Sequence, residues 1–193
     1  KDAFNHANRL QNITVSEGNQ VYAASNGVLF LKTGEIHIWP AANSTDVFTV
    51  PADVTSLPEK MFYNNKSIKT VYIHGNVTSI GANAFYGSNI ERIVFEPSAN
   101  GLVIGNYAFY GCSQLKTIEL PYGTTEIGSQ AFRRSALESI VLPDTVTKVG
   151  TTALAYMPNL KYVKLSAAMT EIPDRCFIED TALEEITLPA SIR

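Results

Sequence analysis

The side chains with the widest chemistry in this chain are three histidines and two cysteines. His6, His37 and His74 fall in three different contexts: a turn, a predicted hairpin and the end of a predicted strand. We interpret each as a polar surface residue rather than as a metal ligand or catalytic base. Cys112 follows a Tyr-Gly turn and Cys176 precedes a phenylalanine. Both settings are typical of cysteines that act as small buried hydrophobic residues.

Other candidate chemistry is equally sparse. The sequence contains no G-x-S-x-G, H-E-x-x-H or G-x-x-x-x-G-K-[ST] motif and no G-x-G-x-x-G after a predicted strand, which excludes the best-known signatures of hydrolases, zinc proteases and nucleotide-binding proteins. An acidic cluster lacks the glycine that lets a calcium loop turn, so we interpret it as a solvated face. Its members are Asp174, Glu179, Asp180, Glu184 and Glu185. The pair Arg133-Arg134 is interpreted as solvated too. We therefore predict no enzyme activity, no catalytic residue, no cofactor and no metal ion.

Length and composition restrict the class of protein further. The 193 residues are 45% hydrophobic and 17% charged, which provides enough apolar material for a core and excludes an intrinsically disordered chain. A net charge of −3 argues against a nucleic-acid partner, because such a partner requires a basic face. Two cysteines are too few for a disulfide scaffold. The uncharged stretch 77–90 is broken by glycine, serine and asparagine, so no transmembrane segment is predicted.

A repeat organises most of the chain. Six segments carry apolar residues at relative positions 1, 4 and 6, which is the L-x-x-L-x-L pattern of leucine-rich repeats. They begin at Ile68, Ile90, Leu115, Leu137, Leu160 and Leu183. These starts are almost evenly spaced, and the longest interval runs from Ile90 to Leu115. Two weaker copies lie at 10–15 and 45–50. Because one such coil cannot bury its own apolar side, the coils must stack into a solenoid with a continuous core.

A second signature recurs between these segments. It reads Val-Thr-x-Ile, then glycine or proline, and then, after two or three residues, Ala-Phe or a close variant. The glycine or proline predicts a change of chain direction, and its place is held by Pro58, Gly81, Gly105, Gly128, Gly150 and Pro173. We expect the Ala-Phe on a short helical or 3-10 turn, with the aromatic ring filling the core. The aromatic place is held by Phe62, Phe85, Phe109, Phe132, Leu154 and Phe177.

The predicted fold class is α/β and rich in β structure: a right-handed leucine-rich-repeat solenoid. A parallel sheet is expected on one face, and short helical or 3-10 turns on the other. We expect a single domain over residues 1–193 with about eight coils. Their strands are predicted near 10–15, 45–50, 68–73, 90–95, 115–120, 137–142, 160–165 and 183–188.

Residues 16–44 interrupt the repeat. The dipeptide Asn26-Gly27 stands between two apolar runs, which is the strongest short-range signal for a β-hairpin. A second turn at 32–35 leads into another apolar run at 36–39. We predict an inserted antiparallel β-meander that projects from the solenoid or folds over its flank. A smaller irregularity at 96–101 lengthens the loop after the strand predicted at 90–95.

The combined pattern, L-x-x-I-x-L-P followed by V-T-x-I-G-x-x-A-F, resembles the BspA-type, or Treponema pallidum-type, leucine-rich repeats over essentially the whole chain. The insert between Asn19 and Pro40 is similar to a hairpin that such proteins often carry. The resemblance implies a secreted or surface-exposed bacterial protein, although some members occur in protozoan parasites. It also implies adhesion to host matrix proteins or cells, or coaggregation with other bacteria. It supplies no fixed catalytic residue.

The turn after each predicted strand departs from the standard leucine-rich repeat. At the place that usually holds asparagine or cysteine only Asn76 fits the standard pattern, and the other coils carry Gly123, Thr145, Ala168 and Ser191. Other groups must therefore satisfy the backbone there. One candidate is a recurring threonine whose hydroxyl bonds to a neighbouring coil, at Thr55, Thr78, Thr125, Thr147 and Thr170. The alternative, that threonine simply suits an exposed extended backbone, stays open.

The outward side of the predicted sheet is the candidate binding face. Positions 3 and 5 of each strand point away from the core, and solenoids bind partners through such extended surfaces. Tyrosine and arginine are enriched at binding hot spots, which singles out Tyr72, Arg92 and Tyr162. The predicted ligand-binding residues are Tyr72, Arg92, Thr117, Glu119, Tyr162 and Lys164. The alternative is that these residue types merely suit any exposed strand.

Together these inferences predict an extracellular, non-enzymatic module that binds a protein or a glycan, with host matrix proteins among the candidates. Two alternatives stay open: a structural spacer that presents another domain at the cell surface, and an accessory carbohydrate-binding region. The last predicted strand, with Leu183, Ile186 and Leu188, carries no polar cap. Because a solenoid end without a cap exposes its core and a strand edge, we expect a fragment of a longer protein, or contacts between ends or edges of neighbouring chains.

Overall fold

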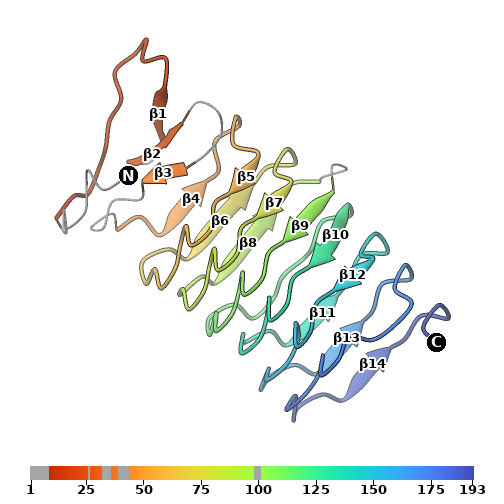
Figure 1. Ribbon diagram of the computed structural model, residues 1–193. Coiled ribbons are helices and arrows are strands. Elements are labelled where there is room, and N and C mark those ends of the chain that lie inside the picture. The colour runs from red at the N-terminus through yellow and green to blue at the C-terminus, as the bar shows by residue number, and fades with distance from the viewer. Residues whose placement is uncertain (1–8, 26, 32–35, 39–43, 98–100) are drawn as a thin grey trace.

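The chain winds into a parallel β-solenoid whose coils stack from the N-terminal to the C-terminal end (Figure 1). This computed structural model describes residues 9–25, 27–31, 36–38, 44–97 and 101–193. Among the described residues, three parallel sheets lie on two faces of the solenoid, and a fourth, antiparallel sheet precedes them. Within the described ranges no segment is helical.

The L-x-x-I-x-L segments form the first face. It carries two three-stranded parallel sheets, in the orders β4-β6-β8 and β11-β13-β14. The strands are β4 (Val47–Thr49), β6 (Thr70–Ile73), β8 (Arg92–Phe95), β11 (Ser139–Val141), β13 (Tyr162–Lys164) and β14 (Glu185–Thr187). Equivalent residues lie side by side, so that Val71 pairs with Phe48 on one side and Ile93 on the other. This register places every inward apolar residue over the next and builds one core.

Two of the predicted strands are absent. Residues 10–15 form no strand, and in that segment the Ile13 N–H donates to Gly27 O at 3.0 Å. Residues 115–120 form no strand either, although their side chains alternate as predicted, with Ile118 and Leu120 buried and Thr117 and Glu119 exposed. Hydrophobic alternation determines which side chains face the core, whereas a strand also requires a neighbouring backbone at hydrogen-bonding distance.

The Val-Thr-x-Ile signature forms a parallel sheet on the second face, here called the second sheet, which its pattern did not predict. The sheet has the order β12-β10-β9-β7-β5. Its strands are β5 (Ser56–Leu57), β7 (Ser79–Ile80), β9 (Leu102–Ile104), β10 (Thr124–Ile127) and β12 (Lys148–Val149). The pairing of β9 with β10 is irregular between Thr124 and Glu126. This sheet runs without interruption past the coil in which the first face is divided.

In the second sheet, a glycine follows every strand that pairs with a strand of the preceding coil. The N–H of Gly128, for example, donates to Ile104 O at 2.8 Å, and a Cβ on Gly128 would lie only 2.6 Å from Asn106 N. Proline holds the same place after β5, the first strand of the sheet, and at Pro173, where the chain forms no strand. Because proline has a Cβ and lacks an N–H, it cannot make this contact with a preceding coil. The two residue types are therefore not equivalent at this place.

The Ala-Phe segments form overlapping β-turns, so the predicted helical or 3-10 turns are wrong. In one coil the Tyr86 N–H donates to Asn83 O at 3.1 Å, and the Ser88 N–H donates to Phe85 O at 3.0 Å. The residues two before and two after the aromatic ring have left-handed φ, 58° at Asn83 and 61° at Gly87. The same two places are left-handed in every coil from that of Phe62 to that of Phe177.

These left-handed residues turn alternate N–H groups toward the next coil. The N–H of Phe85 donates to Ala108 O and that of Phe109 to Ala131 O, both at 2.7 Å. A helical turn would satisfy such groups within one coil. Here they join coil to coil, which explains why the turns are not helical.

Phenylalanine rings stack through the centre of the solenoid. The centroids of Phe62 and Phe85 are 4.9 Å apart, those of Phe85 and Phe109 5.0 Å, and those of Phe109 and Phe132 5.2 Å. All four rings are fully buried. Leu154 continues the row, whereas Phe177 in the last coil is only half-buried. The row therefore weakens toward the C-terminal end.

A three-stranded antiparallel sheet precedes the solenoid. It consists of β1 (Tyr22–Ser25), β2 (Val28–Leu31) and β3 (Ile36–Ile38), in that order. Val28 and Phe30 are buried and belong to the same core cluster as the solenoid, so β2 packs against the first coils. Asn26, the second predicted turn at 32–35 and Trp39 lie outside the described residues.

The last strand, β14, is an exposed edge. Each of its residues is exposed, and Ile186 and the following Leu188 are 37% and 51% exposed. This exposure is what the apolar pattern of the terminal strand predicted.

Candidate binding site on the split first face

The first face is divided at one coil. In the described part of the chain, no backbone hydrogen bond joins β8 to residues 117–120, and none joins residues 117–120 to β11. The divided coil runs from Ile90 to Leu115, which is the longest interval between successive repeat starts. The division thus follows the longest coil of the repeat.

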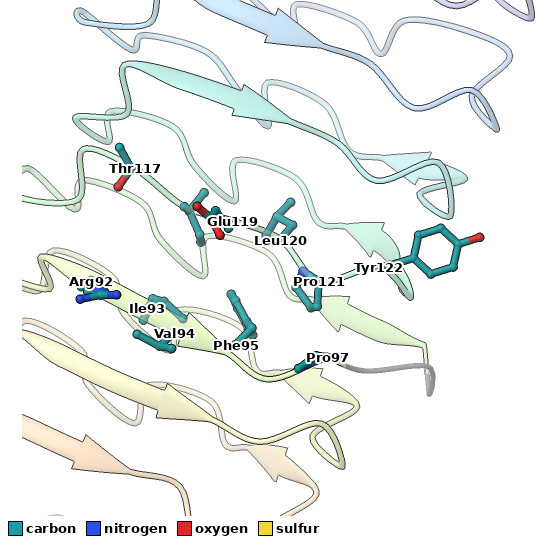
Figure 2. A pocket seen from close by; sticks show the side chains of 11 residues that line it. Arg92, Ile93, Val94, Phe95, Pro97, Thr117, Glu119, Leu120, Pro121 and Tyr122 are labelled. Carbon is teal, nitrogen blue, oxygen red and sulfur yellow. The ribbon is translucent and has the colours of Figure 1, made fainter.

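A cavity of about 790 Å³ opens at this division. β8 forms one wall and residues 117–122 of the next coil form the other, as Figure 2 shows. Its lining includes both the outward residues of the repeat, such as Arg92 and Glu119, and the inward residues, such as Ile93 and Ile118. A depression on top of a closed sheet would be lined by outward residues alone. The cavity therefore passes between the two backbone segments.

The walls combine an apolar interior with charged groups at the outer rim. Ile93, Ile118 and Leu120 are 6%, 8% and 8% exposed, whereas Arg92 and Glu119 are exposed and carry opposite charges. Tyr122 stands at one end of the cavity and is 71% exposed. An apolar pocket with a few polar groups at its mouth is the usual composition of a binding site.

The structure places three of the six predicted ligand-binding residues together. Arg92, Thr117 and Glu119 line the cavity. Tyr72 lies on the neighbouring β6, pairs with Val94 and is 42% exposed. Tyr72 is therefore close to the cavity without lining it.

Tyr162 and Lys164 lie further along the solenoid, on β13. Tyr162 is half-buried, and its hydroxyl lies 3.3 Å from Thr187 Oγ1 on the adjacent strand. Lys164 is exposed. These two residues lie on the other three-stranded sheet of the first face and do not join the cavity.

Several residues of the cavity were not predicted. They are Ile93, Val94, Phe95, Pro97, Ile118, Leu120, Pro121 and Tyr122. Their patterns are those of ordinary core and turn positions. The one sequence signal that marks this place is the long interval from Ile90 to Leu115, because an extra length of coil disturbs the stacking of its neighbours.

The remaining candidate groups behave largely as structural residues. Cys112 and Cys176 are buried free thiols, and burial raises the pKa of each to about 12. His74 is half-buried, with its Nε2 2.8 Å from Pro51 O of the preceding coil. The side chains of His6 and His37 lie outside the described residues. No group of three or more His, Cys, Asp or Glu side chains in the described ranges could hold a metal ion.

The threonine hydroxyls do connect coils. Thr78 Oγ1 donates to Thr55 O at 3.2 Å, and Thr147 Oγ1 donates to Thr125 O at 3.4 Å. Thr145, at the place of the usual asparagine, accepts from the Gly123 N–H at 3.0 Å and donates to Thr124 O at 2.8 Å. The coil-bridging role of threonine is thereby favoured over a simple preference for extended backbone.

Two charged residues are less solvated than predicted. Asp180 is half-buried, unlike the other members of the acidic cluster, and its Oδ1 accepts from the Met157 N–H at 2.7 Å. Arg133 is half-buried with its guanidinium 4.4 Å from the Tyr156 ring centroid, and it donates to Gln130 Oε1 at 2.6 Å. Arg134 is exposed, as predicted. Burial at the interface between two coils is invisible in the local sequence, because the covering residues lie a full repeat away.

Solved structures of bacterial leucine-rich repeat proteins superpose on this solenoid. A leucine-rich repeat protein from Bacteroides ovatus is 26% identical with a TM-score of 0.72, covering 91% of this chain and 47% of that protein. The T. pallidum leucine-rich repeat protein is 24% identical with a TM-score of 0.75, covering 92% of this chain and 84% of its own. One from Eubacterium ventriosum is 22% identical with a TM-score of 0.60, covering 96% and 50%. This chain thus spans about half the length of the Bacteroides ovatus protein.

Comparison with known sequences identifies a family but no individual curated relative. No curated protein sequence matches this chain significantly. No helix in the described residues is both long and apolar enough to cross a bilayer. The model of the BspA type Leucine rich repeat region matches residues 41–102 and 97–193, in six copies, and its two matched segments meet at the long coil. With the repeat pattern, the stacked coils and this match in agreement, the chain belongs to the BspA-type leucine-rich repeat family.

Proposed function

We propose that this chain is a non-enzymatic, extracellular module that binds a partner protein through the first face of its solenoid. The observation that carries the proposal is the cavity of about 790 Å³ between β8 and residues 117–122. Leucine-rich repeats generally bind proteins, and solenoids do so along their extended surfaces. The cavity adds a concave apolar site to the exposed outer side of the first face.

The residues around the cavity are of the types that dominate protein interfaces. Arginine and tyrosine are the most enriched hot-spot residues, and Arg92, Tyr72 and Tyr122 are all exposed at or beside the cavity. The other tyrosine cluster is less suited to binding. The Tyr63, Tyr86 and Tyr110 rings stack on one another with centroids 5.0 and 4.7 Å apart, so the ring faces between them are covered.

Adhesion to a host matrix protein and display on a bacterial surface are the finer parts of this proposal. They are supported by membership of the BspA-type family. Surface display is tested by labelling intact cells of the source organism with a membrane-impermeant reagent. Labelling of the protein only after cell lysis would contradict it.

The binding proposal is tested with arrays of extracellular matrix proteins and of glycans, probed with the purified chain. Arg92→Glu should weaken binding about tenfold or more, as expected for a hot-spot residue. The matched control is Arg175→Glu, because Arg175 is also exposed but lies in a turn away from the first face.

Each outcome distinguishes among the functions considered. Binding to a protein that is lost in Arg92→Glu and kept in Arg175→Glu supports the proposal. Equal loss in both variants would place binding elsewhere. Binding to glycans alone would favour a carbohydrate-binding region. An absence of binding on both arrays would favour a structural spacer.

A further inference from the structure

The division of the first face leaves backbone groups on both sides of the cavity without a partner among the described residues. In β8, the Arg92 N–H donates to Lys69 O at 2.9 Å and the Glu96 N–H donates to Ile73 O at 2.9 Å, both toward β6. Alternate residues of a parallel strand bond to opposite sides. The N–H and C=O groups of Ile93 and Phe95 therefore point toward the cavity.

The opposite wall has the same character. Residues 117–120 have no backbone hydrogen bond to any described part of the chain. The coil that starts at Leu183 shows the usual pairing. There the Glu185 N–H, at the third position of the repeat, donates to Lys161 O of the preceding coil. Thr117 holds this third position in its own coil, and Glu119 lies two residues further on. Because residues two apart along an extended chain bond to the same side, the N–H groups of Thr117 and Glu119 both point toward β8 across the cavity. Two rows of donors and acceptors thus face each other.

The geometry points to an extended peptide segment of a partner protein as the occupant, inserted as an additional strand between β8 and residues 117–120. This inference rests on the proposed protein-binding function and specifies how the partner is held. An extended peptide presents N–H and C=O groups on both of its sides at the spacing of a strand. Adding a strand to an unpaired edge is an established mode of peptide recognition.

The side chains of the cavity define the chemistry of this segment. One face of the inserted strand would lie on Ile93, Ile118 and Leu120, which are nearly buried, and so requires apolar residues. The other face would lie between Arg92 and Glu119, which line the outer rim with opposite charges. It therefore favours one acidic and one basic residue, two positions apart on the same face.

The length of the segment follows from that of β8. This strand has four residues, and an extended chain rises about 3.3 Å per residue. A segment of roughly four to six residues spans it. A sugar or a small apolar ligand could enter the same cavity, but neither would engage two rows of backbone groups.

The test uses an acetylated and amidated synthetic peptide with the order valine, glutamate, valine, lysine, valine, titrated into the full chain. Binding is followed by amide chemical shifts and by hydrogen exchange of assigned backbone N–H groups. Slower exchange is expected at Ile93, Phe95, Thr117 and Glu119. The internal control is β14 (Glu185–Thr187), which is also an exposed edge and should not change.

A second peptide separates backbone pairing from side-chain contact. The same sequence with N-methyl groups at the valine residues keeps every side chain but loses the donors of alternate residues. A third peptide carries the methyl groups on the backbone nitrogens of glutamate and lysine. The two methylated peptides thus remove, one set at a time, the backbone N–H donors on the two sides of the strand. Because an inserted strand uses both of its sides, each methylated peptide should bind about tenfold more weakly or worse.

Three results would overturn the inference: no binding of the unmodified peptide at millimolar concentration, equal binding of the methylated peptides, or protection at β14 instead of at the cavity. The proposed function can be judged separately. A matrix protein found on the array whose binding requires Arg92 but is not displaced by the peptide would leave that function standing and reject the inserted strand.

Discussion

Asp180 is the carboxylate whose surroundings differ most from those of its acidic neighbours. It is half-buried, and one oxygen accepts from the Met157 N–H at 2.7 Å while the other, Oδ2, is buried without a hydrogen-bond partner among the described residues. Burial raises the pKa of Asp180 to about 6, and the bond from Met157 opposes that rise only in part. A single side chain therefore makes folding depend on pH.

The sign of this dependence follows from the raised pKa. Between the ordinary value of 3.8 and about 6, the folded chain binds the proton more tightly than the unfolded chain does, so stability decreases as the pH rises through this range. Asp180→Asn should remove this decrease and stabilise the fold at pH 7.5 relative to the wild type. Urea denaturation at pH 4, 5, 6 and 7.5, followed by circular dichroism, measures the effect.

The control for this prediction is Asp144→Asn. Asp144 also accepts a backbone hydrogen bond from a neighbouring coil, from the Ala167 N–H at 3.0 Å, but it is exposed. The two variants should therefore differ. If Asp180→Asn kept the pH dependence of the wild type, the half-buried carboxylate would not be its source.

At the scale of elements, the second sheet depends on glycine. A Cβ on Gly128 would lie 2.6 Å from both Asn106 N and the Gly105 carbonyl carbon, and these are backbone atoms that cannot move aside. Gly128→Ala should therefore destabilise the fold by about 1–3 kcal/mol, the usual range for an overpacked core. Ser129→Ala, at the next residue, should change stability little. Equal stability of Gly128→Ala and the wild type would show that the coils can separate without cost.

The divided coil predicts a difference in amide exchange between two equivalent residues. Leu120 and Leu142 occupy the same repeat position and are 8% and 1% exposed. The Leu142 N–H donates to Lys164 O at 2.9 Å, whereas residues 117–120 have no backbone partner in the described chain. The Leu120 amide should exchange markedly faster than that of Leu142 in the free protein, because local opening is not required. Similar protection of the two amides would mean that the first face is continuous in solution.

At the scale of the whole molecule, stability should be greatest in the middle of the solenoid. Phe109 stacks between Phe85 and Phe132 and is fully buried, while Phe177 lies half-buried in the last coil. Phe109→Ala should cost about 3–5 kcal/mol, the usual loss for a buried phenylalanine. Phe177→Ala should lower the stability by less, because water can fill the space left by its half-buried ring. A terminal coil is also held by one neighbour only. Denaturation of both variants measures the difference, and equal losses would contradict a stacked core.

The sequence alone determined the features that depend on side-chain type and spacing. The nearly even spacing of the repeat starts from Ile68 to Leu183 implied stacking, because no single coil can bury its apolar side. It also identified the row of buried rings from Phe62 to Phe132 and the inward and outward sides of each strand. Even the segment 117–120, which forms no strand, keeps the burial pattern that its alternation predicts. The burial of these apolar side chains follows from their spacing along the chain, which is local information.

Only the tertiary structure decided which backbone groups pair. Glycine and proline looked interchangeable after the Val-Thr-x-Ile signature, yet only Gly81, Gly105, Gly128 and Gly150 have an N–H that can bond to the preceding coil. The left-handed turns, the burial of Asp180 and the opening beside β8 likewise depend on residues one full repeat away. Hydrogen bonding requires two segments at the correct distance and register. The cavity lined by Arg92, Thr117 and Glu119 is therefore a product of how the coils stack and not of any motif.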